Sequence, residues 1–200
     1  MTPPITNDPP SSPTPPLTRY LDKLSIDRDH LRDLPYLGKL LSLKHLSAAN
    51  NKLTAIPDDI AYVRGLKQLT LVGNALRELN SAVGDLELLE KLEVRSNQLK
   101  FLPISLSKLR VLKQLDASEN FLTALEPSIC DLHEVEKLEL KDNPLQRPPA
   151  STARQGIGAV RKFFQEKLMQ GLMKYYGARV CILGHAQSGK TVRLMTPDDT

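Results

Sequence analysis

Tryptophan is absent from the 200-residue chain and aromatic residues make up only 4% of it, so a hydrophobic core has to be built from aliphatic side chains. Cysteine is scarce too, because Cys130 and Cys181 alone cannot form the disulfide framework of a small secreted domain. No apolar run approaches the roughly 20 residues that cross a bilayer, and the chain does not open on a signal peptide. We therefore expect a cytoplasmic protein without a membrane span, with both cysteines buried as small hydrophobic residues.

An excess of charge of one sign is also lacking over most of the chain. Residues 21–150 carry 18 basic and 19 acidic side chains, and the net charge of +4 comes mainly from residues 151–200, with eight basic and three acidic groups. This balance argues against a nucleic-acid partner. Cys130 and His133 have the spacing of metal ligands, but a zinc ion takes about four ligands. No second pair lies nearby in the sequence, so we expect no metal site there.

What the chain does have is a repeat of 23 residues. The frame LxxLx(L/V/A)xxNxL recurs with its asparagines at Asn51, Asn74, Asn97, Asn120 and Asn143. An upstream copy, Leu21 to Leu31, has Asp29 at the asparagine position. We interpret it as an atypical end repeat, because a terminal repeat lacks one neighbour. A single coil could not bury its own apolar side chains, so stability has to come from the stacking of successive coils.

The frame predicts the structure of each coil. Leu46 and Ala48 alternate with polar residues, as in a short strand with one buried face. An asparagine amide can both donate and accept hydrogen bonds, so stacked copies are expected to form an asparagine ladder in the turn after the strand. The second half of each repeat, for example residues 99–109, has the three- to four-residue apolar spacing of a short helical or 3₁₀ segment. We expect these segments on the outer, convex side.

These repeats resemble the intracellular, 23-residue class of leucine-rich-repeat proteins, and the resemblance covers residues 21–149. It implies an α/β fold, a solenoid of about six repeats whose curved parallel sheet lines a concave face that binds a protein partner. By analogy with signalling scaffolds of this fold, the expected partner is a small GTPase, a kinase or a phosphatase.

The outward-facing strand positions define the candidate binding residues. They form columns across the repeats, with small and neutral residues in the N-terminal half and charged residues in the C-terminal half. The expected contact residues are Lys91, Glu93, Arg95, Gln114, Asp116, Lys137, Glu139 and Lys141. A rigid, preformed surface presents such groups without an ordering cost on binding. The alternative is that these charges only pair with one another, each pair contributing little to stability.

The segments that flank the repeats differ from them in composition. Residues 1–20 contain seven of the 15 prolines and few apolar groups, which predicts a disordered tail, with a PxxP partner motif as the alternative. Residues 150–176 predict an amphipathic helix with one apolar face, made of Ile157, Val160, Phe164 and Leu168. We expect this helix to cover the apolar end of the last coil. A membrane-surface helix is the alternative, but no polybasic run accompanies it.

Residues 178–191 contain an apolar, strand-like run followed by GHAQSGKT, which matches the GxxxxGK[ST] phosphate loop. In such a loop glycines let the backbone approach phosphates, the lysine reaches the terminal phosphates and the hydroxyl binds Mg²⁺. Repeats, a helix and this motif together resemble the Roco family, in which a Ras-like GTPase domain follows the repeats. The resemblance implies that a guanine nucleotide and its magnesium would contact Gly184, Gly189, Lys190 and Thr191, with Thr191 as the Mg²⁺ ligand.

The motif is not followed by the rest of a nucleotide-binding domain. Nine residues come after Thr191, and Pro197 would end the expected helix after about one and a half turns. A second metal-binding aspartate, switch regions and a base-reading segment have no room. We therefore interpret residues 177–200 as an incomplete stub of a truncated Roco-like chain, with the apolar residues Val180, Ile182 and Leu183 lacking sheet partners. No cofactor is expected, since GTP and Mg²⁺ would need the complete domain.

Two functions follow from these observations. The repeats contain no constellation of acid, base and nucleophile, which favours a non-catalytic protein–protein interaction module or scaffold in intracellular signalling. The alternative is a GTP-binding regulator of the Roco type, of which this chain has only the P-loop and whose complete parent would be a GTPase.

Overall fold

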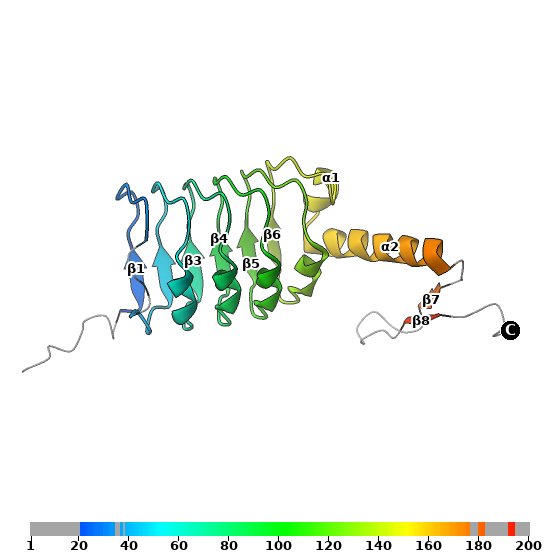
Figure 1. The fold of residues 1–200 in the computed structure, drawn as a ribbon, viewed down its shortest axis with the longest axis horizontal. Helices are drawn as coiled ribbons and strands as arrows, with labels where there is room; N and C mark the ends of the chain where they lie inside the picture. Colours follow the sequence, from blue (N-terminus) through cyan, green and yellow to red (C-terminus); the bar gives the residue numbers. More distant parts are fainter. Residues whose placement is uncertain (1–20, 35–36, 38, 177–179, 183–191, 195–200) are drawn as a thin grey trace, which may run out of the picture.

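Six short parallel strands form one continuous sheet whose strand order is the order in the chain (Figure 1). The computed structural model describes residues 21–34, 37, 39–176, 180–182 and 192–194. The strands are β1 (Lys23–Ser25), β2 (His45–Ser47), β3 (Gln68–Thr70), β4 (Lys91–Glu93), β5 (Gln114–Asp116) and β6 (Lys137–Glu139). From β2 onward, residues 23 positions apart lie opposite one another, so that Leu46 faces Leu69 and Leu69 faces Leu92. The repeat and its register are therefore confirmed.

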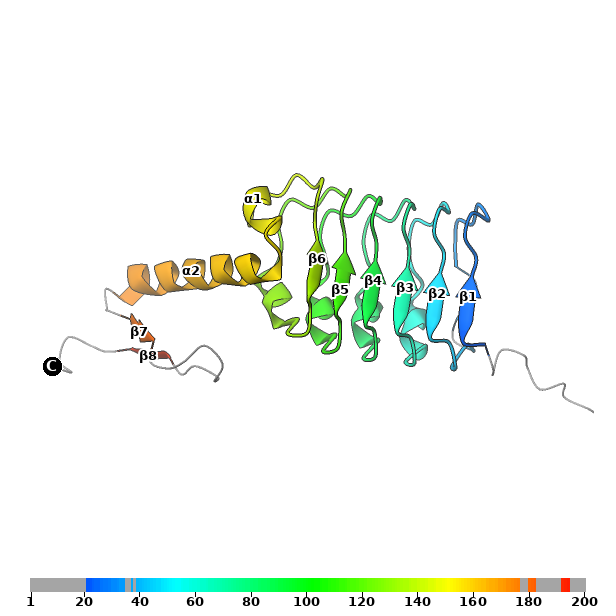
Figure 2. The ribbon, with the colours of Figure 1, turned by 180° about the vertical axis from the view of Figure 1, so that it is seen from behind.

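Short 3₁₀ helices line the side of the solenoid away from the sheet, as the sequence predicts (Figure 2). They are η2 (Asp58–Tyr62), η3 (Ser81–Asp85), η4 (Ile104–Lys108) and η5 (Pro127–Asp131). Proline, with its fixed φ, precedes or begins three of them, whereas Asn80 caps η3 by accepting a hydrogen bond from the Ala82 amide. At Gly84 a Cβ would lie 2.3 Å from the Ser105 carbonyl oxygen, so only glycine permits the close stacking of η3 on η4.

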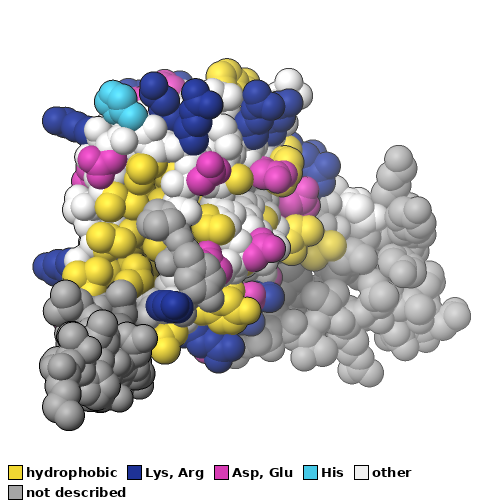
Figure 3. All heavy atoms as spheres, turned by 60° about the vertical axis from the view of Figure 1, so that its left-hand side comes forward, with side chains coloured by type: hydrophobic (Ala, Val, Ile, Leu, Met, Phe, Trp, Pro, Cys, Tyr) yellow, Lys and Arg dark blue, Asp and Glu magenta, His cyan; other side chains and the backbone are white. Residues whose placement is uncertain are grey.

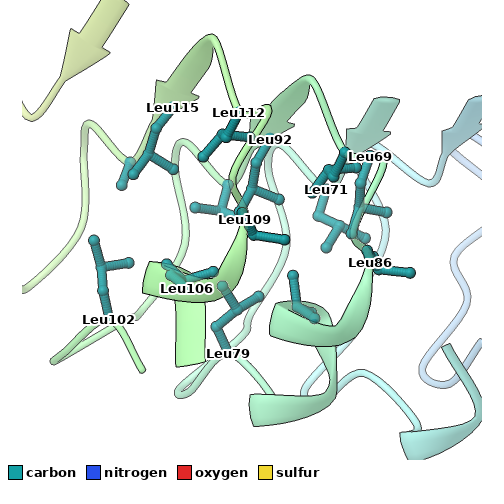
Figure 4. Close-up of a cluster of buried hydrophobic side chains, with 14 of the residues drawn as sticks. Leu69, Leu71, Leu79, Leu86, Leu92, Leu102, Leu106, Leu109, Leu112 and Leu115 are labelled. Atoms are coloured by element: carbon teal, nitrogen blue, oxygen red, sulfur yellow. The ribbon is translucent and has the colours of Figure 1, made fainter. Parts of the chain in front are cut away.

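Aliphatic side chains between the sheet and the 3₁₀ helices form one core that runs through all the coils (Figure 4). One repeat contributes seven of them, each at most 2% exposed: Leu69, Leu71, Leu76, Leu79, Val83, Leu86 and Leu89. Full burial of such a side chain contributes about 1.5–3 kcal/mol, and most of the burial comes from the coils on either side. The predicted stacking is therefore what holds the fold together.

The predicted asparagine ladder is present in all five full repeats. Asn97 shows the pattern: its Nδ2 donates to the Leu71 carbonyl of the preceding coil (2.9 Å) and to the Val94 carbonyl of its own coil (3.0 Å). Its Oδ1 accepts from the Leu76 amide at 3.1 Å. The equivalent bonds to the preceding coil are made by Asn51, Asn74, Asn120 and Asn143. Each asparagine thus joins two coils by satisfying backbone groups that have no water to bond.

The first coil is atypical, as expected. Strand β1 pairs with β2 in register, but Asp29 is exposed. Four apolar side chains in the first half of this coil are only partly buried, because no described coil covers them: Leu21, Leu24, Ile26 and Leu31. Figure 3 shows hydrophobic side chains gathered at this end of the molecule.

At the other end the chain continues into α1 (Ala150–Ala153) and α2 (Ile157–Tyr176). Ile157, Val160 and Phe164 are buried in the same core as the repeats. Leu168, predicted on the same face, is instead 64% exposed. Helix α2 extends well past the last coil in Figures 1 and 2, and the residues of α2 that are buried in the repeat core lie in its first turns.

The C-terminal segment departs from the sequence-based expectation. Strand β7 (Val180–Ile182) pairs antiparallel with β8 (Val192–Leu194), so the prediction that Val180 and Ile182 lack sheet partners is wrong. Residues 192–194 form a strand where the phosphate-loop motif predicts a helix. A helix of about one and a half turns has few internal hydrogen bonds, whereas apolar residues that alternate with Arg193 suit a two-stranded pairing. Residues 1–20, the predicted tail, lie outside the described residues.

Candidate functional site

The outward side chains of strands β1 to β6, with the residue two positions after each strand, form the surface that we call the strand face. Within each of β2 to β5 the central leucine is buried and the residues on either side are partly exposed. The parallel register places corresponding residues opposite one another, as with Lys91 and Gln114 or Glu93 and Asp116. The columns predicted from the sequence therefore exist as rows of neighbouring side chains.

Glu93 is the most enclosed of the predicted contact residues that form ion pairs. Its side chain is 20% exposed, and it forms an ion pair with Lys91 at 3.0 Å within the same strand. The hydroxyl of Thr70, on the neighbouring strand, donates to the second carboxylate oxygen at 2.9 Å. Both carboxylate oxygens of Glu93 thus already have a partner within the protein.

Arg95 belongs to a network that joins two coils. Its Nε donates to Glu119 Oε1 at 3.0 Å, its terminal nitrogen forms an ion pair with the same oxygen, and the Ser96 hydroxyl donates to Glu119 Oε2. Hydrogen bonds from Arg95 and then from Ser96 hold the pKa of Glu119 below its ordinary value, and Glu119 in turn raises the pKa of Arg95. The guanidinium is therefore held in one orientation on the strand face.

Sequence reasoning missed Glu119. It lies directly before the ladder asparagine, a position that takes the left-handed backbone conformation in every full repeat: Asn50, Gly73, Ser96, Glu119 and Asp142, with φ between 53° and 69°. Asparagine, glycine and aspartate tolerate this conformation, but serine and glutamate do so at a cost. Glu119 is therefore strained and also paired to Arg95, a combination that often marks a functional site. The signal in the sequence was a glutamate in a column of turn-forming residues.

The remaining predicted contact residues differ in accessibility. Asp116 accepts from the Ser118 amide at 3.0 Å and from the Ser118 hydroxyl, and Ser118 is buried. In the last coil, Lys137 and Lys141 have side chains 59% and 69% exposed, and both lie 3.9 Å from a carboxylate. Glu139, the partner of Lys137, is 45% exposed. The accessible charge of the strand face therefore increases toward the C-terminal coil.

In the N-terminal half of the strand face, neutral hydroxyl and amide groups donate hydrogen bonds to Asp27. Asp27 accepts from the Ser47 hydroxyl at 2.7 Å, the Ala49 amide at 2.6 Å and the Ser25 hydroxyl at 2.9 Å. Burial raises the pKa of this carboxyl, but the hydrogen bond from Ser47 and the others outweigh it, and the pKa lies below its ordinary value. A shallow pocket of about 250 Å³, lined by hydroxyls and His45, lies on this half. The two halves thus differ in chemistry, as the sequence predicts.

Ion pairs also run along the edge of the strand face. Glu90 lies between Lys67 (3.2 Å) and Lys113 (3.1 Å), one coil on each side. The hydrogen bond from Lys113, and then that from Lys67, lowers the pKa of Glu90. The alternative interpretation, that strand-face charges pair with one another, describes this edge well.

The residues predicted to bind nucleotide and Mg²⁺, Gly184, Gly189, Lys190 and Thr191, lie outside the described residues. Among the residues that are described, no group of three or more His, Cys, Asp or Glu side chains is placed to bind a metal ion. Cys130 is partly buried, and this burial raises the pKa of its thiol. No described helix is long and apolar enough to cross a bilayer.

Comparison of the sequence with protein-family profiles and with curated proteins gives no match. The fold, however, is similar to solved structures. A leucine-rich-repeat protein of Leptospira interrogans is 34% identical with a TM-score of 0.57, over 58% of this chain and 30% of that one. The leucine-rich-repeat ectodomain of a membrane receptor kinase from Arabidopsis thaliana, in complex with Casparian strip integrity factor 2, is 29% identical with a TM-score of 0.55, over 62% and 16%.

A third structure shows the fold alone. The functional domain of InlJ from Listeria monocytogenes is 21% identical with a TM-score of 0.56, over 63% of this chain and 26% of that domain. The chain thus spans less than a third of the length of each of these structures. The 23-residue frame, the asparagine ladder and these similarities define a leucine-rich-repeat fold.

Proposed function

We propose that the chain is a non-catalytic protein–protein interaction module, or scaffold, that binds a polypeptide on its strand face. The observation that carries this proposal is the held geometry of the charged half of that face. Ladder asparagines lock neighbouring coils together, and Arg95 is oriented by Glu119 and Ser96. Charged groups that are already ordered lose little side-chain entropy on binding, so they favour recognition of a defined partner.

The proposed contact surface is the C-terminal half of the strand face. It consists of the predicted residues Lys91, Glu93, Arg95, Gln114, Asp116, Lys137, Glu139 and Lys141, with Glu119 added by the structure. Acidic and basic groups alternate on it, which suits a partner segment of mixed charge rather than a polyanion. The more accessible residues of β6 would form the outer part of the contact, and the enclosed Glu93 its centre.

A charge-reversal experiment tests this surface. Glu93, Asp116 and Glu139 are changed to Lys and Arg95 to Glu, and proteins retained by the immobilised chain are identified by mass spectrometry. The matched control reverses three exposed acids and one base away from the strand face: Glu78, Glu87, Glu134 and Arg110. We expect partners of the wild type to be lost from the first variant and kept by the second. Unchanged capture by the strand-face variant would refute the proposal.

The proposal for the partner names a class of protein and a cellular compartment. A small GTPase, kinase or phosphatase in the cytoplasm is the proposed partner, because the sparse cysteines and the 23-residue repeat are typical of intracellular leucine-rich-repeat proteins. The identities of the proteins that the strand face retains test this proposal. Nuclear or extracellular proteins as the only specific partners would contradict it.

Nucleotide binding of the Roco type is the second candidate, and it rests on the GxxxxGK[ST] motif. The strand at residues 192–194 stands where that motif needs a helix N-terminus, which weakens this candidate. We expect no saturable binding of a fluorescent GTP analogue with Mg²⁺. Micromolar binding that is abolished in the Lys190→Ala variant would establish the nucleotide function instead.

A further inference from the structure

A groove of about 800 Å³, which we call the helix groove, lies between η5 and α2. Its walls come from η5, from the chain around Arg147 and from the face of α2 between Arg161 and Leu168. Arg161 and Leu168 are seven positions apart, which is about 10 Å or two turns of helix. The helix groove is made by the last coil and α2, and none of the proposed strand-face residues lines it.

Basic side chains predominate around the helix groove. Arg147, Arg161 and Lys167 line it, against the single acid Asp131. The guanidinium of Arg161 is engaged: it donates to the carbonyls of Cys130 and His133 at 3.4 Å and to that of Leu132. Within the described part of the chain no ion pair involves Arg147 or Lys167, although Lys167 donates to Gln170 at 3.2 Å. Two cations are thus available to an anionic ligand.

The floor of the helix groove is apolar. Phe164 is 8% exposed and Leu168 is 64% exposed, one helical turn further along α2. The sequence predicts that both belong to the buried face of α2, but the last coil covers only Phe164. An exposed leucine next to a buried phenylalanine, in a groove that Arg147 and Lys167 also line, is a place for one large apolar side chain accompanied by carboxylates.

We propose that the helix groove binds a short acidic segment of a partner polypeptide. In it a leucine or phenylalanine of the partner packs on Phe164 and Leu168, and carboxylates of the partner pair with Arg147 and Lys167. A nucleic acid or an anionic membrane fits less well, because affinity for either comes from many cations and the apolar floor would contribute little to it. This site is separate from the strand face, so the chain would hold two partner segments at once.

Selection from a random-peptide library on the immobilised full chain tests the proposal without knowledge of the partner. We expect the enriched peptides to contain Asp or Glu on both sides of a Leu or Phe. Their dissociation constants, measured by fluorescence polarisation, should increase about tenfold in the Arg147→Gln, Lys167→Gln double variant, because two charge-assisted pairs are lost. Binding should also weaken at high salt.

Two control variants separate the helix groove from other surfaces. Lys162→Gln removes an exposed lysine of α2 that does not line the groove, and Glu119→Gln alters the strand face alone. Both should bind the selected peptides as the wild type does, with circular dichroism showing that every variant is folded. The proposal fails if selection yields no peptide, if the enriched peptides are neutral or basic, or if they bind the double variant unchanged. Binding to phosphatidylserine vesicles in place of acidic peptides would overturn it as well.

Discussion

The two ends of the described solenoid are built in different ways. At the N-terminal end the first coil leaves Leu24 and Ile26 partly exposed and replaces the ladder asparagine by Asp29. At the C-terminal end Asn143 makes the full set of ladder bonds, and Val160 and Phe164 of α2 are buried on the last coil. One end therefore changes its residue types, whereas the other adds a helix. The difference teaches that the ladder asparagine joins a coil to the coil before it, and no coil is described before the first one.

The largest expected effect comes from the ladder at the two ends. Asn143→Ala leaves the Ala117 and Leu140 carbonyls and the Leu122 amide without this partner in a buried site, and should cost about 3–4 kcal/mol. Asp29→Ala should change stability by about 0.5 kcal/mol or less, because Asp29 is exposed. Urea unfolding followed by circular dichroism measures both. Equal losses would show that the two ends are not organised differently.

The packing of the ends should differ less. Phe164→Ala removes a buried ring from the C-terminal end and should cost about 2–3 kcal/mol. Leu24→Ala at the N-terminal end should cost about 1 kcal/mol, since this side chain is already partly exposed. The same unfolding experiment applies, with Leu168→Ala as the control on α2, expected to be nearly neutral. A larger loss for Leu24 than for Phe164 would reverse the comparison.

Arg161 fixes α2 to the last coil through three carbonyls, and the N-terminal end has no described counterpart. Arg161→Gln should cost about 1–2 kcal/mol, because the guanidinium's hydrogen bonds to the end of η5 are lost. Hydrogen exchange of α2 amides should become faster while that of β2 to β5 stays unchanged. Lys162→Gln, one residue further on α2, is the control. Unaltered exchange in α2 would mean that the apolar contacts alone hold the helix.

The smallest effect concerns pH at the two ends of the strand face. Because the folded pKa of Glu119 is depressed by Arg95 and that of Asp27 by its hydrogen bonds, both carboxylates stabilise the fold above their ordinary pKa values. That stability is lost as the pH falls through the lowered values. In molar salt the pKa of Glu119 should rise toward 4.5, since Arg95 is screened. That of Asp27, held mainly by neutral donors, should change less. NMR titration measures both, and equal salt shifts would contradict this distinction.

The repetitive part of the fold could be predicted because each coil has the same spacing of leucines and asparagine. The spacing of leucines and Asn97 or Asn120 is enough to place the strands, their register and the ladder. The candidate site could be predicted only as columns, since outward positions follow from the pleat of the strands. That Glu93 is enclosed while Lys141 is exposed depends on side chains from other coils, which no single repeat contains.

Glu119 is the clearest example of a site residue that could not be predicted from the sequence. Its pairing with Arg95 arises because a left-handed backbone at this position turns its side chain toward the preceding coil. The presence of a glutamate in the sequence does not predict this contact.

The sequence by itself determined that the chain stacks as a leucine-rich-repeat solenoid, because the 23-residue spacing forces every coil to bury its leucines against the next. Only the tertiary structure decided how far α2 is covered, which cations remain free in the helix groove, and that residues 192–194 pair as a strand. These outcomes depend on contacts between segments that are distant in the sequence. Such contacts are a property of the packed molecule, and no local sequence pattern contains them.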